Sequence, residues 1–429
     1  AMLGQMGKPG GGIAYGYTIT NYLGNNVFKM PYAPLPQGKN LVTDFIPVAR
    51  VSDMLLNPGQ KFDYDGREYT YPDIDMIYWA GGNPFHHHQD LGRLRKAWEK
   101  PSTVVVNEWC WNALARHADI ILPCTTTLER QDIGMTPRDP FVISMDKAIE
   151  PVGEAKNDYD IFAGIARRMN TEDSFTEGRS AEDWQKWIWE QSCKRAAKLN
   201  VQMPDYESFR EAGFYKSPDL KEDRIFLSDF FEDPDKNPLG TPSGKIEIFS
   251  ETIDSFNYED CPGHPTWMEP TEWLGAKEKA YPLHLISNQP KTKLHSQMDN
   301  GTLSSSIKIK GHQPLEMNPD DAKSRGITQG DIVRVFNGRG SCLCGVNITT
   351  DVMPGVVIIS TGSWYDPAEP NDPKSMCKHG NPNVLSPDIG TSKLGQGPAA
   401  HSCLAEIEKY DGPVQDITAF NPPEIIEKK

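Results

Sequence analysis

The sequence predicts an α/β fold in which a parallel β-sheet with helices is followed by a β-rich, barrel-like domain. Three observations lead to this prediction. Short apolar runs alternate with helical stretches over residues 74–123, turn-punctuated strands dominate residues 241–410, and 429 residues are more than one ordinary core contains. A hydrophobic content of 38%, with 10 Trp, 15 Tyr and 16 Phe, is enough to bury such cores.

The sheet is predicted from apolar runs of strand length at residues 74–80, 102–106 and 120–123. Leu91, Leu94 and Trp98 form one helical stripe between the first two runs, and residues 111–119 suit a short helix. Continuous apolar strands joined by helices indicate a parallel sheet that is covered on both faces. Residues 1–70 precede it and are expected to be irregular loops.

The rest of the chain divides by pattern into a helix, a helical connection, a barrel and a tail. The helix spans residues 157–170 and is expected to bury Ile161, Phe162, Ile165 and Met169. Later strands are expected at 241–250, 281–287, 330–349 and 355–360, with an Asn337-Gly338 hairpin and a helix at 319–327. The predicted domains are 1–170 (partial α/β), 171–240 (helical connection), 241–410 (C-terminal β-barrel) and 411–429, a tail expected to be loosely packed.

Charge and cysteine content exclude several classes of protein. The net charge of −15 argues against a nucleic-acid partner, and no apolar run reaches the roughly 18 residues that cross a bilayer. None of the eight cysteines forms a CxxC pair, which argues against an iron–sulfur cluster or structural zinc in this chain. Cys342 and Cys344 are expected on one side of a strand, as ordinary strand residues rather than a redox pair. The first residues, "AMLGQMGKPGGG", read as the inside of a domain, so a fragment is expected.

Parallel sheets bind ligands beyond the carboxyl ends of their strands, which here are "GGNPFHHH", "NEW" and "CTTTLERQD". Three adjacent histidines, His86 to His88, rarely converge on one ion, because neighbouring side chains point in different directions. A polar loop that offers one or two imidazoles to a ligand is favoured over a metal site, and histidines that cap the next helix are the third alternative.

Single residues at these strand ends have both structural and functional interpretations. Asn83 is compatible with a left-handed turn or with an amide that contacts a ligand. Glu108, which follows Asn107, could accept hydrogen bonds from sugar hydroxyls. Arg130 suits a phosphate or a salt bridge with Glu129 or Asp132. Asp160 could be the N-cap of a helix, or its carboxylate could accept hydrogen bonds from the N1–H and N2–H₂ edge of a guanine. In the barrel region, the polar loops 288–297 and 381–402 are long enough to be functional.

Five stretches together resemble the molybdopterin oxidoreductases, in the branch of dimethyl sulfoxide, trimethylamine N-oxide and biotin sulfoxide reductases. These stretches are "GGNPFHHHQDLGRLRKAW", "ARHADIILPCTTTLERQDIG", "KLHSQ", "NPDDAKSRGITQGDIVRVFNGRG" and "GSWYDPAEP…CKHGNPNVLSPDIGTSKLGQG". The resemblance covers most of residues 1–410. It implies the C-terminal portion of the family fold, namely part of a dinucleotide-binding-like α/β domain and a double-psi type barrel.

The resemblance also implies a cofactor, molybdenum bis(molybdopterin guanine dinucleotide), and the residues that bind it. The guanosine-phosphate contacts carry over to Asn83, His87, Asn107, Glu108, Arg130 and Asp160. The pterin and phosphate contacts carry over to Ser287, Asn288, Gln289, Pro290, Lys293, His295, Ser296, Gln297, Asn383, Ala400 and His401. Three positions depart from the family pattern. "NEWCW" replaces "HEPWW", Lys293 stands where Arg is common, and Ala400-His401 replaces Gly-Gln.

The implied reaction is oxygen-atom transfer from an S-oxide or N-oxide. The molybdenum-ligating serine of the family lies upstream, so neither a catalytic residue nor a metal ligand is assigned here. The implied partners are the small-molecule oxide, the N-terminal half of the same enzyme and a cytochrome c or quinol-linked electron donor. The implied location is the periplasm, with the cytoplasm as the alternative. A nitrate reductase or formate dehydrogenase type of enzyme, or a non-catalytic cofactor-binding fragment, are the alternative functions.

Overall fold

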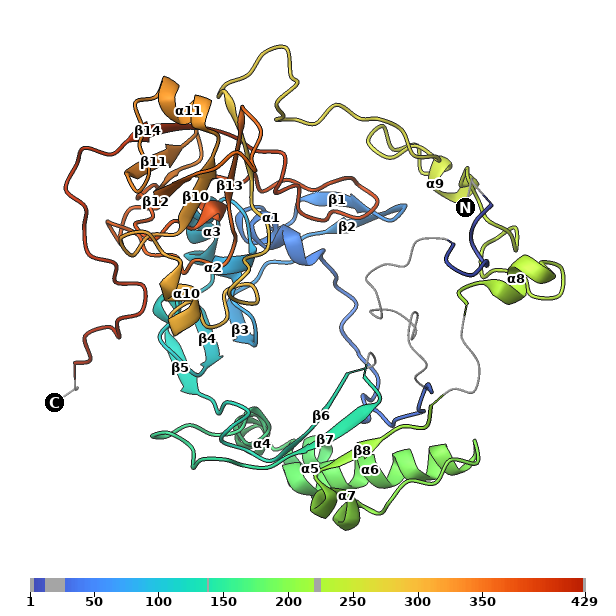
Figure 1. Cartoon of the computed structure of the whole chain (residues 1–429). Coiled ribbons are helices and arrows are strands. Elements are labelled where there is room, and N and C mark those ends of the chain that lie inside the picture. The colour runs from blue at the N-terminus through green and yellow to red at the C-terminus, as the bar shows by residue number, and fades with distance from the viewer. Residues whose placement is uncertain (1–3, 12–27, 137–138, 220–224, 427–429) are drawn as a thin grey trace. The chain divides into compact units, whose positions relative to one another are not determined.

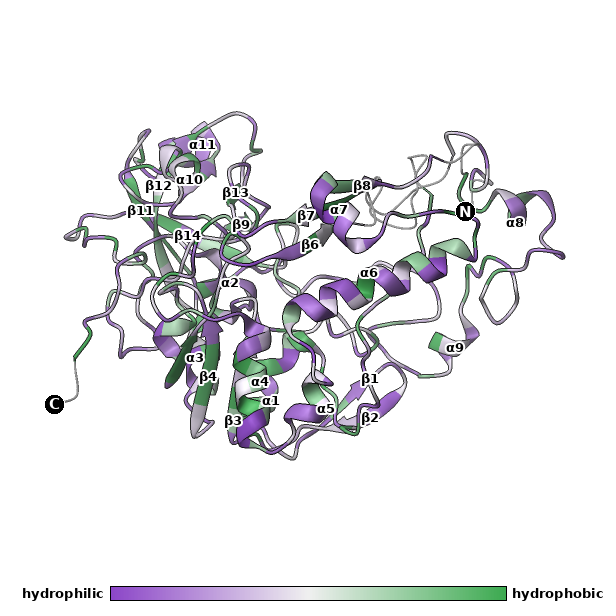
Figure 2. Ribbon diagram, turned by 90° about the horizontal axis from the view of Figure 1, so that it is seen from below, coloured by the Kyte–Doolittle hydropathy of each residue, from purple (hydrophilic) through white to green (hydrophobic). Residues whose placement is uncertain are grey.

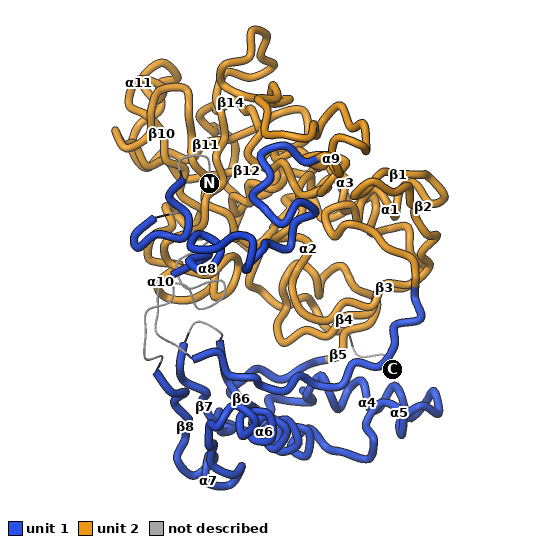
Figure 3. The backbone as a smooth tube through the Cα atoms, turned by 90° about the vertical axis from the view of Figure 1, so that its right-hand side faces the viewer, with its two compact units in different colours: residues 1–42, 123–250 blue, residues 43–122, 251–429 orange. Residues whose placement is uncertain are grey.

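The computed structural model describes residues 4–11, 28–136, 139–219 and 225–426 (Figure 1). The chain forms two compact units, residues 1–42 with 123–250 and residues 43–122 with 251–429 (Figure 3). Both units are discontinuous in sequence, whereas the domains predicted from the sequence are continuous. Those predicted boundaries stay a proposal.

The first unit contains an antiparallel sheet with helices on one face. Strand order is β6-β7-β8, and every neighbouring pair is antiparallel. Val142, Trp189, Tyr206 and Phe209 form its core, in which the Trp189 and Phe209 rings stack at 3.8 Å. Its elements are β6 (Asp132–Met135), β7 (Phe141–Met145), α4 (Asp158–Arg168), α5 (Glu172–Thr176), α6 (Ala181–Ala197), α7 (Tyr206–Ala212), β8 (Phe214–Lys216) and α8 (Ser228–Glu232).

The second unit combines the predicted parallel strands with the predicted barrel. β3 (Met76–Ala80) and β4 (Thr103–Glu108) pair in parallel, and β5 (Ile120–Pro123) lies on the other side of β4. The central valines of β4 are buried and stand out as hydrophobic in Figure 2. Around this sheet lie η1 (Val48–Arg50), α1 (Val51–Leu56), β1 (Lys61–Tyr64), β2 (Arg67–Thr70), α2 (Pro84–His87), α3 (Leu91–Trp98) and η2 (Ala115–His117).

A closed six-stranded barrel, in the order β10-β12-β11-β14-β9-β13, fills the rest of the second unit. Closure leaves no free strand edge, so each barrel strand pairs on both sides. The elements are α9 (Glu251–Asp254), β9 (Leu283–Ile286), α10 (Thr302–Ser306), β10 (Pro314–Met317), α11 (Pro319–Ser324), β11 (Ile332–Phe336), β12 (Ser341–Ile348), β13 (Val356–Ile359), η3 (Pro382–Val384) and β14 (Leu404–Lys409).

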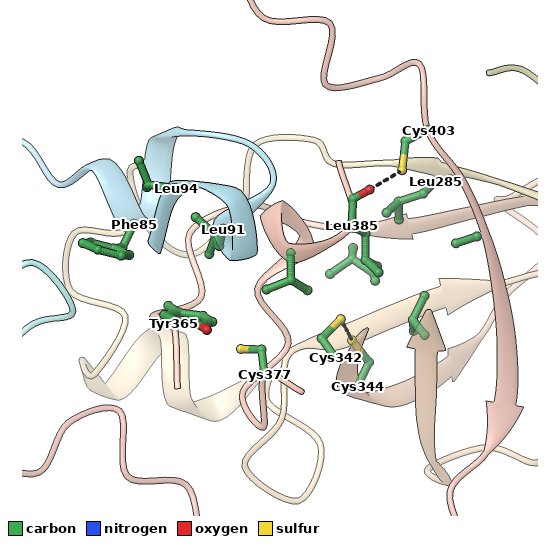
Figure 4. Close-up of a cluster of buried hydrophobic side chains, with 14 of the residues drawn as sticks. Phe85, Leu91, Leu94, Leu285, Cys342, Cys344, Tyr365, Cys377, Leu385 and Cys403 are labelled. Carbon is green, nitrogen blue, oxygen red and sulfur yellow. Dashed lines mark hydrogen bonds between the residues drawn. The ribbon is translucent and has the colours of Figure 1, made fainter. Parts of the chain in front are cut away.

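One hydrophobic core joins the sheet and the barrel of the second unit. It runs from Phe85 and Leu91 beside α2 and α3, past Tyr365, to Leu285 inside the barrel (Figure 4). The Cys342 and Cys344 sulfurs lie 4.0 Å apart in this core, so both thiols face one side, as predicted. The hydrogen bond with the Cys344 thiol, together with burial, holds the pKa of Cys342 well above its usual range. It is therefore an unreactive packing residue.

Several sequence expectations need correction. Residues 241–250, all of which the structure describes, form turns instead of a strand, and Ile248 stays 59% exposed. The barrel closes with six other strands, so no strand position remains there for this segment. In α4, Ala163 and Ala166 are buried, whereas Met169 is 66% exposed. The expected helix at 111–119 is reduced to the 3₁₀ turn η2.

Parts of two segments expected to be irregular or loose are ordered among the described residues. Residues 1–70 include α1 and the hairpin β1–β2, whose Asp65-Gly66 turn has positive φ at both residues. This is the Asp-Gly hairpin signal. The tail also packs: Ala419 is 2% exposed, and the Thr418 N–H donates to Asp366 at 2.6 Å. No helix in the part of the chain that the structure describes is long and apolar enough to cross a membrane.

Candidate cofactor-binding site

The loop after β3 is shaped by two glycines and an asparagine cap. Gly81 and Gly82 have φ of 80° and 76°, which other residues rarely adopt, and they turn the chain sharply at the strand end. Asn83 follows in extended geometry, with φ at −149°, so the left-handed turn, which was one of the two interpretations of this residue, is wrong. Its side-chain oxygen accepts the Phe85 N–H at 3.0 Å and caps α2. The buried Asn83 Nδ2 has no hydrogen-bond partner among the described residues.

Two buried asparagines fix α2 in place, Asn383 from η3 and Asn381, which is the N-cap residue of η3. Asn381 Nδ2 donates to the Phe85 carbonyl at 3.1 Å, and Asn383 Nδ2 donates to the His86 carbonyl at 3.0 Å. Asn383 Oδ1 accepts from the Ser386 hydroxyl at 3.0 Å. The predicted site residue Asn383 therefore lies beside α2 and holds the backbone of that helix.

The three histidines have different surroundings. His86 is 4% exposed, its ring lies 5.9 Å from the Trp364 ring, and neither ring nitrogen has a partner among the described residues. Burial lowers the pKa of His86 to about 3, so its imidazole is neutral. His87 is exposed, with its ring 5.9 Å from the His295 ring. His88 is buried. The described residues contain no group of three or more side chains that could hold a metal ion.

The carboxyl ends of β9 and β13 bring a second set of predicted residues together. These strands are parallel neighbours, so the loops that follow them lie side by side. The Ser360 hydroxyl donates to Asn288 Oδ1 at 2.7 Å, and the Thr361 N–H donates to the Asn288 carbonyl at 2.9 Å. Of the predicted residues, Pro290 is buried, Ser287 is partly exposed, and Asn288 and Gln289 are exposed.

The segment that follows turns back against Trp364. Its indole N–H donates to the Ser296 carbonyl at 2.8 Å. His295 has a positive φ of 51°, and its side chain is exposed, as is that of Gln297. Lys293 is the exception in this segment. Its side chain is 1% exposed, and its ammonium lies 2.6 Å from Asp299.

Asn107 and Glu108 lie at the carboxyl end of β4, as predicted. Tyr78 donates to Asn107 Oδ1 at 2.8 Å. Glu108 accepts from Asn112 Nδ2 at 2.6 Å and from the Trp109 N–H at 2.9 Å. Asn107 thus contacts the neighbouring strand β3, and Glu108 holds the loop after β4.

Arg130 and Asp160 belong to the other compact unit. Arg130 donates to the Thr125 carbonyl at 3.1 Å and pairs with Asp132 at 3.2 Å, which is one of the two ion pairs expected for it. Asp160 is exposed and accepts from Asn157 Nδ2 at 3.1 Å. Asn157 rather than Asp160 is the N-cap residue of α4. Arg130 lines a cavity of about 630 Å³ together with Asn157 and the rings of Tyr159, Phe175 and Trp184.

Ala400 and His401 lie in the turn before β14, Ala400 partly exposed and His401 exposed. The backbone of His401 accepts a hydrogen bond from the imidazole of His284 in β9, and burial lowers the pKa of that imidazole. His401 therefore contacts the barrel wall through its backbone.

Sequence reasoning missed the charged residues beneath the predicted site. Asp299, Lys308 and His379 surround Lys293, and Trp364 packs against His86. Asp299 and Lys308 stand in stretches without periodicity, so no local signal marks them. His379 belongs to "KHGNPN", where the quoted resemblance could have drawn attention to it.

Buried polar atoms without partners test whether a polar ligand suits these loops. Such atoms cost free energy unless a ligand or water satisfies them. Four of the nine atoms of this kind among the described residues lie in α2 and in the segments that follow β3 and β9, namely Asn83 Nδ2, both nitrogens of His86 and Thr292 Oγ1. One amide donor, an imidazole and a hydroxyl suit a ligand rich in carbonyl, amine and phosphoryl groups, as a pterin dinucleotide is.

The fold and the site define a class of protein: an α/β protein with a closed barrel, whose strand-end loops gather buried polar groups. Residues 1–168 match the family described as molybdopterin oxidoreductase, and residues 283–404 match the molydopterin dinucleotide binding domain. The chain belongs to the molybdopterin oxidoreductases.

Named relatives come from the branch expected from the sequence. The chain is 45% identical, over 99% of its length, to a dimethyl sulfoxide/trimethylamine N-oxide reductase of Cereibacter sphaeroides, and covers 53% of it. It is 44% identical to a biotin sulfoxide reductase of that organism, over 97% of this chain and 55% of the relative. For a trimethylamine-N-oxide reductase of Haemophilus influenzae the identity is 41%, over 99% of this chain and 53% of the relative. The chain spans about half the length of these relatives.

A solved structure supports the fold. Acetylene hydratase from Pelobacter acetylenicus aligns with a TM-score of 0.60 at 21% identity, over 79% of this chain and 45% of that one. At this identity the likeness concerns the fold alone.

Proposed function

We propose that the chain is the C-terminal part of a molybdenum bis(molybdopterin guanine dinucleotide) reductase of S-oxides or N-oxides. The observation that carries the proposal is the set of unpartnered, buried polar atoms at the ends of β3 and β9. Identities of 41–45% to reductases of dimethyl sulfoxide, trimethylamine N-oxide and biotin sulfoxide supply the substrate class.

In the second unit, Asn83 Nδ2 and the exposed His87 would contact the guanosine-phosphate end of the cofactor. Lys293 and the exposed His295 would contact its pterin and phosphate groups. The remaining residues proposed for this unit are Asn107, Glu108, Ser287, Asn288, Gln289, Pro290, Ser296, Gln297, Asn383, Ala400 and His401.

In the first unit, Arg130 and Asp160 would bind the nucleotide end. Arg130 would hold a phosphate, and Asp160 would accept from the N1–H and N2–H₂ edge of guanine. The exposed Asp160 carboxylate and the aromatic cavity beside Arg130 support this assignment. The double-psi barrel, the dinucleotide-binding character of the sheet and the domain boundaries at residues 170, 240 and 410 belong to the same proposal.

When bound, the molybdenum centre supplies two-electron oxygen-atom transfer from the oxide. This chain's residues bind and orient the cofactor, and its buried loops exclude water from the pterin. No residue of this chain is assigned to the chemical step. The proposed partners are the oxide, the N-terminal half of the enzyme, and a cytochrome c or quinol-linked electron donor. A periplasmic location is proposed for the whole enzyme.

The proposal is tested on the full-length protein by molybdenum analysis and by reduction of dimethyl sulfoxide and trimethylamine N-oxide. We expect stoichiometric molybdenum and turnover from the whole enzyme, and no stoichiometric molybdenum from residues 1–429 alone. Asn83→Leu should lower the cofactor content of the full-length enzyme several-fold, because an amide donor is lost and hydrocarbon faces the ligand. Asn371→Leu, a change at an exposed asparagine, is the control.

Two results would contradict the proposal. One is full molybdenum content without reduction of any oxide, which would favour a nitrate reductase or formate dehydrogenase type of enzyme. The other is a full-length protein that binds no molybdenum, which would favour a non-catalytic fragment.

A further inference from the structure

A fully buried carboxylate joins two lysines beneath the candidate site. Asp299 is 0% exposed and lies 2.6 Å from the Lys293 ammonium and 3.0 Å from the Lys308 ammonium. It also accepts the Trp364 backbone N–H at 3.1 Å. The two lysine side chains are 1% and 5% exposed, so water screens neither of them.

His379 completes the cluster as a neutral imidazole. Its Nδ1 lies 3.0 Å from the Trp364 carbonyl, which can only accept, so Nδ1 carries the proton. Nε2 is then free to accept from the Lys308 ammonium at 2.6 Å. Burial lowers the pKa of His379 to about 4, which agrees with a neutral ring.

The cluster therefore carries a net charge of +1 out of contact with water, from two lysines and one aspartate. The neighbouring pair of Asp366 and Lys378, 3.6 Å apart, adds no charge to the sum. Burying an uncompensated charge costs several kcal/mol, and proteins usually neutralise such a charge with a counter-ion. Burial also lowers the pKa of Lys308, an effect that a bound anion would oppose.

Two buried side chains of this region have hydrogen-bonding capacity that the described residues leave unused. Lys293 donates to Asp299 and, at 3.5 Å, weakly to Gln313, which leaves one ammonium proton uncommitted among the described residues. His86 has two buried nitrogens without partners, and Asp299, His379 and Lys293 all act on its charge. An oxyanion here would neutralise the excess charge and accept from both side chains.

We propose that Lys293, Asp299, Lys308 and His379 form, with His86, a buried subsite for a phosphate-type oxyanion. In this subsite Lys293 and His86 touch the oxyanion, while Lys308 and Asp299 position Lys293. The inference rests on the proposed function, in which the oxyanion is a phosphoryl group of the pterin dinucleotide. It adds Asp299, Lys308, His379 and His86 to the residues that act on the cofactor.

The test measures binding of inorganic diphosphate to the 429-residue chain, by calorimetry and thermal shift at low ionic strength. We expect diphosphate to bind and raise Tm, and Lys308→Met to weaken the binding about tenfold or more, because this variant removes the excess positive charge of the cluster. Lys310→Met removes the same charge at an exposed position two residues away and should change the affinity less than twofold. Absence of binding, or equal weakening by both variants, would overturn the proposal.

Asp299→Asn should change diphosphate binding in the direction opposite to Lys308→Met, and it therefore separates ligand binding from folding. This variant raises the net charge of the cluster to +2, so the folded chain loses stability. Diphosphate should then raise the Tm of the variant by more than it raises the Tm of the wild type. A purely structural cluster would lose stability without this larger shift, and that result would also overturn the proposal. Lys308→Gln, which keeps a donor without charge, replaces Lys308→Met should that variant fail to fold.

The outcome is independent of the substrate assignment. If diphosphate binds but the full-length enzyme reduces no oxide, the subsite stands and the proposed reaction is wrong. If the full-length enzyme loads molybdenum and reduces oxides but the chain ignores diphosphate, only the subsite is wrong. Inorganic phosphate serves as a second probe: preference for diphosphate supports a dinucleotide, and equal affinity supports a single phosphate.

Discussion

His86 shows at the scale of one residue how a buried polar group without partners lowers the stability of a fold. Its two unpartnered nitrogens are desolvated without compensation, a cost that a hydrocarbon of similar volume would not incur. The exposed neighbour His87 carries no such cost. Adjacent residues of identical type therefore have opposite energetic roles, which only their burial distinguishes.

This contrast predicts the effect of His86→Leu. The change should raise the free energy of unfolding of the chain at pH 7 by about 1–2 kcal/mol, because it removes two unsatisfied polar atoms. Urea denaturation measures the effect, and His87→Leu should leave the free energy within about 0.5 kcal/mol. A loss of stability in His86→Leu would mean that the ring nitrogens are satisfied.

At the scale of elements, α2 depends on η3, which is nearly 300 residues away in the sequence. Asn383 and Asn381 satisfy two α2 carbonyls that a four-residue helix cannot satisfy internally. Asn383→Ala should lower the free energy of unfolding by about 1–3 kcal/mol, because the His86 carbonyl loses its buried partner. The exposed Asn371→Ala is the matched control in the same urea titration. Equal effects of the two changes would refute this role.

Buried and exposed side chains alternate along β7 in the sheet of the first unit, which allows a second test at the scale of elements. Val142 is 2% exposed and packs on Trp189, whereas Ile143, one residue further along β7, is 51% exposed. Val142→Thr should cost about 1–3 kcal/mol by burying a hydroxyl, while Ile143→Thr should be nearly neutral and should raise solubility. Circular dichroism during heating and the concentration at which the chain precipitates report the two effects.

Sequence patterns predicted the elements whose signals are local. The strands β3, β4, β9, β11, β12 and β13 followed from apolar runs, and the hairpin at Asn337 followed from its turn residues. The pattern failed at residues 241–250, because an apolar alternation becomes a strand only where another strand accepts its hydrogen bonds. Asp299 and Lys308 could not be predicted, since their meaning comes from contacts across the fold with Lys293 and His379.

At the scale of the whole molecule, acid has two opposing effects on stability. The net charge of −15 favours mild acid, because protonated carboxylates repel less. Buried histidines favour neutral pH. The pKa of His379 is lowered from 6.5 to about 4 and that of His86 to about 3, so the folded state binds fewer protons than the unfolded state between these values. Their contribution is fully present above about pH 6.5 and is lost as pH falls toward 4 and 3.

The salt concentration determines which of these two effects dominates the measured stability. Charge repulsion acts across exposed surface, and at about 0.5 M salt the Debye length falls to roughly 4 Å, which screens most of it. The histidines are inside and remain unscreened, and each should cost about 2 kcal/mol at pH 5 by linkage. We therefore expect urea midpoints measured in high salt to fall between pH 7 and pH 5, and to fall less in His86→Leu. Midpoints that rise, or that fall equally in the variant, would show that these imidazoles take up protons in the folded state.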